Sequence, residues 1–224
     1  MALPPGAADD SFIREVDEEY RRAQLNKLWA RWGRWLIVTI VLLLAALGGF
    51  LWWRAEQVRA AGVKGEEFAL ALGKVETGNL PEATPVLAKL AGGNGGYATL
   101  AKLTQASAAT TAGDTARAVA IYDGIAGDAA QPQPFRDLAT VKAMRLQFDA
   151  LPPQTVIDRL KTLSVPGNPW FGVAGEMTAA ARLKANQPQL AGALLASIAS
   201  DKTLPVPLRG RAQQLAESLG VEVK

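Results

Sequence analysis

The chain has 224 residues, with 24 Lys or Arg against 21 Asp or Glu, and it contains neither histidine nor cysteine. Without these two residue types, a serine–histidine triad, a cysteine nucleophile and the common zinc sites are all excluded, so we expect no enzyme activity, no cofactor and no metal. Charges of both signs are interspersed without a basic stripe, so we expect no nucleic-acid partner. A protein without enzyme activity is also expected to have no small-molecule substrate.

Residues 1–34 are expected to contain an amphipathic helix. Ser11 is predicted to cap a helix that begins at Phe12, with Glu15 near the positive end of the helix dipole. Apolar residues then recur at spacings typical of one helix face, at Phe12, Ile13, Val16, Tyr20, Ala23 and Leu28. This helix either extends the next segment in solvent or docks its apolar face on a cytoplasmic partner.

Residues 35–53 form an uncharged apolar segment between Arg34 and Arg54. At ~1.5 Å per residue, a helix of this length covers roughly 28 Å, close to the thickness of a bilayer core. Tryptophan favours the headgroup layer at each end, and we expect interface anchors at Trp29, Trp32, Trp35, Trp52 and Trp53. The segment predicts a single transmembrane helix, because a buried core helix would explain neither the aromatic ends nor the flanking arginines.

A cleaved signal peptide is the closest alternative for this segment. Its apolar region is shorter, at ~7–15 residues, and leads into a cleavage site of small residues. Here charged residues separate the apolar segment from Ala60, Ala61 and Gly62, which predicts an uncleaved signal anchor. Positions 20–34 hold five Lys or Arg against three in positions 54–68, so we expect a cytoplasmic N-terminus and residues 54–224 on the far side, the periplasm in a bacterium.

Residues 54–224 are expected to form a helical repeat domain. Helix-length segments alternate with short breaks rich in Gly, Pro, Asn and Asp, and no segment has the alternation typical of strands. The sequence that begins at Gly78 lies 35 positions before a similar one that begins at Gly113. Paired helices with a period near 34 are typical of tetratricopeptide repeats, and an irregular helical array is the alternative. The expected helices are 65–77, 81–91, 96–111, 115–125, 135–150, 153–163, 170–185, 188–200 and 205–219.

The clearest repeat copy predicts how its helices pack. Small Ala106 precedes Gly113 by seven positions, and Ala118 and Tyr122 follow Gly113 by five and nine. Ala83 is the counterpart of Ala118 in the preceding copy. We expect the alanines to let two helices approach, Gly113 to close the turn and Tyr122 to pack on the neighbouring helix. Asp128, in the next connector, is expected to contribute little to stability.

The expected core extends along the whole repeat domain. It comprises Phe68, Leu72, Leu87, Leu90, Leu103, Ile121, Tyr122, Ile125, Leu138, Leu146, Val156, Leu160, Leu163, Leu183, Leu194, Ile198, Leu208 and Leu215. Trp170 and Phe171 are interpreted as core, with an exposed binding pair as the alternative. The glycine-rich segment 92–96 is interpreted as a connector, because a phosphate-binding loop needs a preceding strand and a Gly-Lys-Ser/Thr ending.

The order of these parts resembles a known family. Segments 11–19 and 28–33, the single span and the degenerate helical repeats are similar to the YfgM-type ancillary subunits of the Sec translocon. The similarity in sequence is strongest between Ser11 and Arg54. It implies a bacterial inner-membrane protein with a cytoplasmic N-terminus and a periplasmic repeat domain. It also implies association with the SecYEG channel and with a membrane-anchored periplasmic chaperone of the peptidyl-prolyl isomerase type.

Together these features predict an all-α fold, with a single N-terminal transmembrane helix followed by a tetratricopeptide-like helical repeat array. The predicted function is a non-enzymatic membrane-anchored adaptor that assists the handling of translocated proteins. One alternative is a self-associating structural or envelope-coordinating repeat protein. Another is a regulator that sequesters a cytoplasmic factor through its N-terminal helix. The sequence assigns no partner-binding residues.

Overall fold

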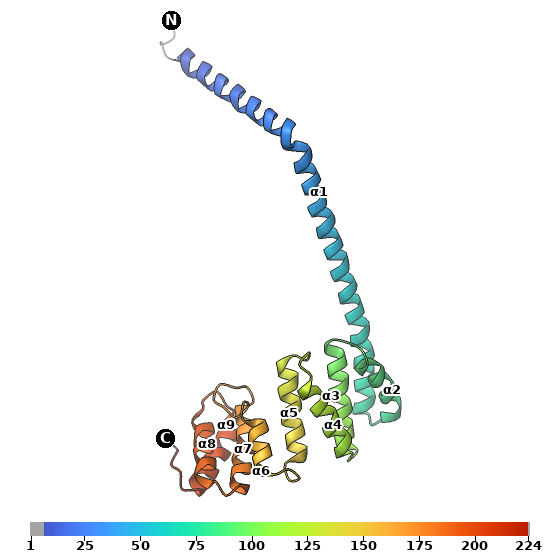
Figure 1. Ribbon diagram of the computed structural model, residues 1–224, viewed down its shortest axis with the longest axis vertical. Coiled ribbons are helices and arrows are strands. Elements are labelled where there is room, and N and C mark those ends of the chain that lie inside the picture. Colours follow the sequence, from blue (N-terminus) through green and yellow to red (C-terminus); the bar gives the residue numbers. More distant parts are fainter. Residues whose placement is uncertain (1–6, 224) are drawn as a thin grey trace. The chain divides into compact units, whose positions relative to one another are not determined.

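The computed structural model describes residues 7–223 and confirms the expected all-helical fold class (Figure 1). No residue in this range lies in a strand. The chain divides into two compact units, the first ending at Val63 and the second comprising Lys64–Lys224. The helices are α1 (Ala7–Glu76), α2 (Leu80–Ala91), α3 (Gly96–Thr111), α4 (Thr115–Gly127), α5 (Gln133–Gln147), α6 (Pro153–Leu160), α7 (Phe171–Lys184), α8 (Pro188–Ser200) and α9 (Val206–Ser218).

Helix α1 is one continuous helix of 70 residues. It begins at Ala7, so the prediction that Ser11 caps a helix starting at Phe12 is wrong. It also continues through Gly62 and Gly65 to Glu76, because no proline interrupts it, and the separate helix expected at 65–77 is therefore the end of α1. The side chains of Phe12, Ile13, Val16, Tyr20, Ala23 and Leu28 lie outside the part of the chain whose side chains the structure describes.

Helix α1 contains a candidate membrane span. Among the described residues it is the one helix that is long and apolar enough to cross a bilayer, by length and composition. The most apolar 18-residue window has a mean hydropathy of 2.4 and buries none of its residues. The Thr39 hydroxyl donates a hydrogen bond to the Trp35 carbonyl at 2.9 Å, so this polar group is satisfied within the helix. An exposed apolar surface of this extent marks an interaction with lipid or protein.

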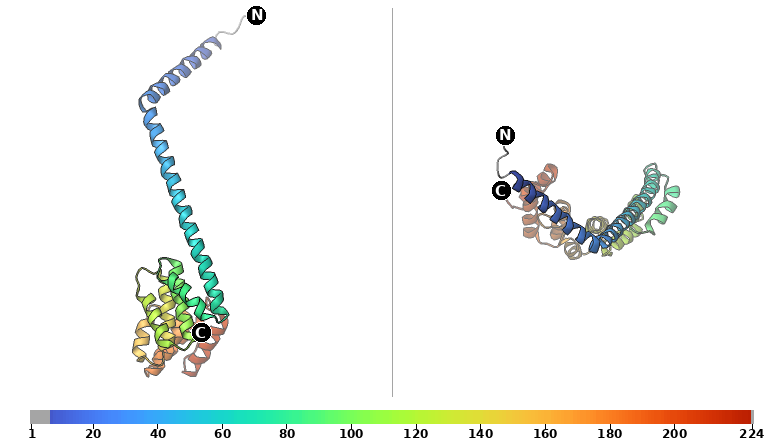
Figure 2. Two further views of the ribbon diagram at one scale, coloured as in Figure 1. Left: turned by 90° about the vertical axis from the view of Figure 1, so that its right-hand side faces the viewer. Right: turned by 90° about the horizontal axis from the view of Figure 1, so that it is seen from above.

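The second unit is a curved row of helices that contact mainly their neighbours in the chain (Figures 1 and 2). This pattern is typical of repeat proteins. The end of α1 pairs with α2, followed by the pairs α3–α4, α5–α6 and α7–α8. The second helices of these pairs begin at Leu80, Thr115, Pro153 and Pro188, with separations of 35, 38 and 35 residues. The structure thus confirms a tetratricopeptide-like helical array, and α9 covers its end.

Three of the four pairs share one type of turn. In each, a residue in the left-handed region follows the first helix, and the next backbone N–H donates to a carbonyl five residues earlier. This Schellman motif satisfies carbonyls at the helix end and favours glycine or asparagine. The residues are Gly78, Gly113 and Asn186, with φ of 77°, 79° and 58°. The hydrogen bonds join Asn79 to Lys74 at 2.8 Å, and Asp114 to Ala109 and Gln187 to Arg182 at 2.9 Å.

Most of the expected core residues are buried or partly buried. Phe171 is 1% exposed, which confirms its interpretation as core, and the half-buried Trp170 packs against the largest buried cluster. Two expectations are wrong, since Leu183 and Leu215 are 40% and 48% exposed. Leu183 follows the last buried residue of α7, and Leu215 lies on α9, which buries only Ala212 and Ala216 against the row. Sequence reasoning missed the buried Met144 and Leu195.

Candidate functional site

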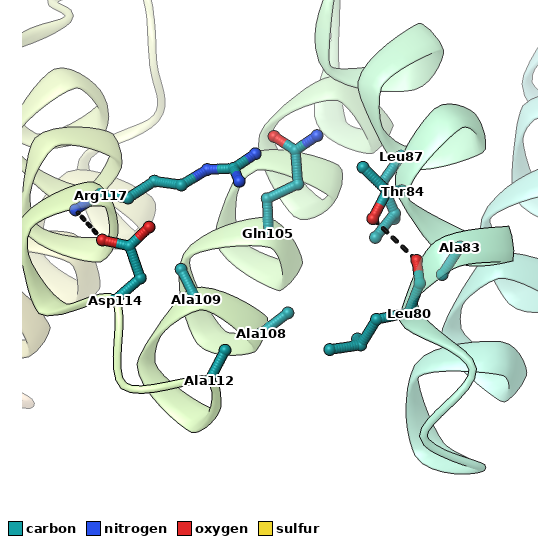
Figure 3. Close-up of a pocket in the computed structure, with 10 residues that line it drawn as sticks. All are labelled: Leu80, Ala83, Thr84, Leu87, Gln105, Ala108, Ala109, Ala112, Asp114 and Arg117. Carbon is teal, nitrogen blue, oxygen red and sulfur yellow. Dashed lines mark hydrogen bonds between the residues drawn. The ribbon is translucent and has the colours of Figure 1, made fainter.

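A groove runs along α3 between α2 and α4, and Figure 3 shows the smaller of its two hollows. It consists of two hollows of about 130 Å³ and 490 Å³, and Gln105 lines both. We call this surface the α3 groove. Its floor is formed by Lys102, Gln105, Ala108 and Ala112 of α3, and its walls are α2 and α4.

The floor follows from the spacing of residues along α3. Lys102, Gln105, Ala108 and Ala112 recur at intervals of three or four, which places them along one side of the helix. Ala101, Ala106 and other small residues of α3 are buried in the row. Helix α3 thus has small residues on the side that is buried against other helices, and also along the floor of the groove. Helices α2 and α4 pack on either side of α3 and leave the floor accessible.

The walls are mainly apolar and partly made of small residues. Helix α2 contributes Leu87 and Ala88, and α4 contributes Ile121 and Gly124. Apart from its chain neighbours and the backbone of its own helix, no atom lies within 4 Å of the position that a Cβ of Gly124 would occupy. A large side chain at Ala88 or Gly124 would occupy the larger hollow, so these small residues keep it open.

Arg117 extends over the groove from the first turn of α4. The Asp114 carboxylate accepts a hydrogen bond from the Arg117 backbone N–H at 3.1 Å, which caps the start of α4. The Arg117 side chain extends away from that carboxylate toward Gln105 (Figure 3). No hydrogen bond or ion pair joins its guanidinium to another residue among those described.

Lys102 brings a second cation to the groove, one helical turn from Gln105. In the described part of the chain its ammonium forms no ion pair within 4.0 Å, although Asp128 is near enough to interact electrostatically. The groove therefore combines an apolar surface with two cations that no carboxylate neutralises directly. This arrangement can bind an apolar segment that carries negative charge.

The groove contains no recognisable catalytic arrangement. The chain has no histidine or cysteine, and the Asp114 carboxylate is engaged in capping α4. Among the residues whose side chains the structure describes, no group of three or more acidic side chains could hold a metal ion.

The residues predicted to pack the repeat lie in or beside the core. Ala83, Ala106 and Ala118 are fully buried, and Tyr122 is 4% exposed. Burial raises the pKa of the Tyr122 hydroxyl above its ordinary value of 10.0. Gly113 closes the turn between α3 and α4, whereas Ala83 also lines the α3 groove.

The five tryptophans predicted to anchor the span are all more than half exposed: Trp29, Trp32, Trp35, Trp52 and Trp53. The Trp29 ring lies directly over Gly33, where an added Cβ would come within 3.0 Å of the ring. Gly33 therefore permits this contact. The role of the tryptophans at a membrane interface stays a prediction.

The connector after α4 is more organised than its sequence indicated. The Asp128 carboxylate accepts hydrogen bonds from Ala130 N at 3.0 Å and from Gln131 Nε2 at 2.8 Å. Gln131 in turn accepts one from the buried Thr99 hydroxyl of α3. The hydrogen bonds from Gln131 and Ala130 hold the pKa of Asp128 below its ordinary 3.8. Asp128 therefore organises its own connector, and Gln131 joins this connector to α3. That Asp128 contributes little to stability stays a prediction.

Sequence reasoning did not find the α3 groove. The signal that could have indicated it is weak: alanine or glycine at 88, 108, 112 and 124, with cations at 102 and 117. These residues come from three helices, and only their packing brings them together.

Comparison with known proteins identifies a family but no individual relative. No curated protein and no solved structure matches the chain. A family model described as a tetratricopeptide repeat-like domain matches residues 26–165. The match covers more than half of the chain, from just before the candidate span to just beyond α6, and includes the α3 groove. The chain therefore belongs to the tetratricopeptide repeat-like family.

Proposed function

We propose that this protein is a non-enzymatic, membrane-anchored adaptor that binds another protein in the α3 groove. The observation that carries this proposal is an apolar groove with two unneutralised cations, in a repeat unit that follows a candidate membrane span. Repeat arrays of this kind offer extended surfaces to protein partners. Family membership supports the same class of function.

We further propose that α1 spans a bacterial inner membrane, with residues 1–34 in the cytoplasm and 54–224 in the periplasm. The Lys and Arg distribution around residues 35–53 supports this orientation. The resemblance of residues 11–54 supports the SecYEG channel and a membrane-anchored periplasmic chaperone as partners. The adaptor would then help to handle chains that emerge from the channel.

Site-specific photo-crosslinking in cells tests the proposed function. One crosslinker replaces Ala108 on the groove floor, and a control crosslinker replaces Lys142, which is exposed on α5 and does not line the groove. We expect Ala108, and not Lys142, to capture a translocon subunit or a periplasmic chaperone, identified by mass spectrometry. Capture of a second copy of the chain alone would support the self-associating alternative. Equal capture from both positions would contradict binding in the groove.

The contribution of the anchor is tested separately by changing it. An anchor beside the partner raises the effective concentration of a weak contact, to the order of millimolar for a short tether. Residues 60–224 without the anchor should therefore bind the same partners much more weakly. Replacement of residues 35–53 by an unrelated span of equal length should retain most association. If the foreign span abolishes association, recognition lies within the bilayer and the adaptor proposal for the repeat unit fails.

A further inference from the structure

We infer that the α3 groove binds an amphipathic helix of a partner protein, and that this helix presents a carboxylate to Lys102 and Arg117. The inference rests on the proposed function and specifies the chemistry of the partner at the same site.

The secondary structure of the groove favours a helical occupant. Floor and walls belong to α2, α3 and α4, whose backbone groups are largely hydrogen-bonded within their own helices. An extended segment would find few backbone partners there and would bury unpaired N–H and C=O groups at a cost. A helix satisfies its own backbone and needs only side-chain contacts. The floor extends from Lys102 to Ala112 of α3, so the groove offers a length of roughly 16 Å, or about three helical turns.

The size of the wall and floor residues also suits a helix. Ala88, Ala108, Ala112 and Gly124 keep their side chains short, so the backbone of an occupant can approach closely. The larger hollow, of about 490 Å³, has room for apolar side chains that project from successive turns of the occupant. Only Lys102 and Gln105 give this hollow polar side chains, so apolar contacts dominate it.

The charges of the groove select an acidic occupant. Lys102 lies one helical turn from Gln105, and the Arg117 side chain extends toward Gln105 (Figure 3). The two nearby carboxylates already accept hydrogen bonds, Asp114 from the Arg117 backbone N–H and Asp128 from Ala130 and Gln131. A neutral apolar helix would cover both cations without replacing their water, which is costly. A helix with Glu or Asp facing them gains two ion pairs and avoids this cost. The same cations thus attract an acidic helix and discriminate against a neutral one.

A set of synthetic peptides tests this inference on the full chain in lipid nanodiscs. The first is a fluorescent amphipathic helix of roughly 16 residues, with an Ala/Leu face flanked by Glu. The second has Gln in place of Glu, and the third keeps Glu but carries a central proline that breaks the helix. By fluorescence anisotropy at low salt, we expect the Glu peptide to bind about three- to tenfold more tightly than the Gln peptide. The proline peptide should bind far more weakly than either.

Two pairs of variants locate the effect in the groove. Lys102→Gln with Arg117→Gln should remove the preference for Glu over Gln. Lys142→Gln with Arg145→Gln makes the same change in net charge on the exposed surface of α5 and should retain the preference. Ala108→Trp fills the groove and should weaken binding of both helical peptides, whereas Ala120→Trp, at an exposed position on α4, should not.

Several results would overturn the inference. If the Glu and Gln peptides bind equally well, the inference that the partner is acidic is refuted. If the proline peptide binds as well as the Glu peptide, the inference that the partner is helical is refuted. Equal loss of preference in both double variants would show a general charge effect rather than a site. The outcome is separable from the proposed function, because the in-cell capture from Ala108 does not depend on these peptides. A partner captured there that binds through a neutral or extended segment would refute this inference alone.

Discussion

Replacement of Tyr122 by alanine tests the repeat packing most directly. Tyr122 is 4% exposed and belongs to the largest buried cluster, together with Ala106, Ala118 and Met144. This cluster contains residues from α3 to α7, so the tyrosine ring is part of a core that continues across several repeat pairs. Removal of the ring would leave a cavity that the neighbouring alanines cannot fill.

The expected loss follows from the buried area. A buried aromatic side chain removes about 150–250 Å² from water, worth roughly 4–6 kcal/mol at ~25 cal/mol per Å². Measured aromatic-to-alanine changes of about 3–5 kcal/mol agree with this range. We therefore expect Tyr122→Ala to lower the free energy of unfolding by about 3–5 kcal/mol, a large part of the ~5–15 kcal/mol typical of a domain. For a unit of this size the melting temperature should fall by roughly 6–20 °C.

Urea denaturation of residues 60–224, followed by circular dichroism, measures this loss. Tyr97→Ala is the matched control, because Tyr97 is only partly buried and its ring centroid lies 6.2 Å from that of Phe68. Its substitution should cost about half as much, on the order of 2 kcal/mol. Tyr122→Phe keeps the ring and should cost about 1 kcal/mol or less. If Tyr122→Ala costs no more than Tyr97→Ala, the role assigned to Tyr122 in the repeat is refuted.

Four further predictions follow from the fold, the turns, the buried tyrosine and the proposed orientation. Residues 60–224, separated from the span, should give a fully helical circular dichroism spectrum; a substantial strand signal would contradict the expected folding of this unit. Gly113→Ala should destabilise the protein by about 1 kcal/mol, because Gly113 has φ of 79°. Gly124→Ala, inside α4 with free space around it, should instead stabilise the protein by up to about 1 kcal/mol. Equal effects of the two substitutions would contradict the role of Gly113 in the turn. Burial raises the folded pKa of Tyr122 above 10.0, so the contribution of its neutral hydroxyl to stability should be complete below the unfolded pKa and should be lost as pH rises through the folded pKa. The free energy of unfolding in urea should therefore fall with increasing alkaline pH in the natural protein, and this part of the fall should be absent from Tyr122→Phe. Protease added to cells with a permeabilised outer membrane should digest residues 54–224 and spare residues 1–34, and protection of the repeat unit would overturn the orientation.

Local sequence determined the helical repeat of this protein. Helices α3 and α8 begin and end at the predicted residues, because glycine, proline and polar connectors bound them within a few positions in the chain. The turn at Gly113 was predictable for the same reason, since a left-handed residue after a helix favours glycine. The apolar segment of α1 is likewise a property of consecutive residues. These features depend on contacts between residues close in sequence, and such contacts leave a periodic signal.

The tertiary structure alone decided which of these helix faces stay accessible. Leu183 and Leu215 have the spacing of core residues, yet no later helix covers the outer side of α9, and Leu183 lies beyond the buried part of α7. The hydrogen bond between Thr99 and Gln131 joins residues 32 apart. The α3 groove depends on the packing of α2 and α4 on either side of α3, which brings Ala88 and Gly124 to one hollow. Helical periodicity specifies the face on which a residue lies, but the neighbour that covers that face is set by packing between helices, which has no local signal.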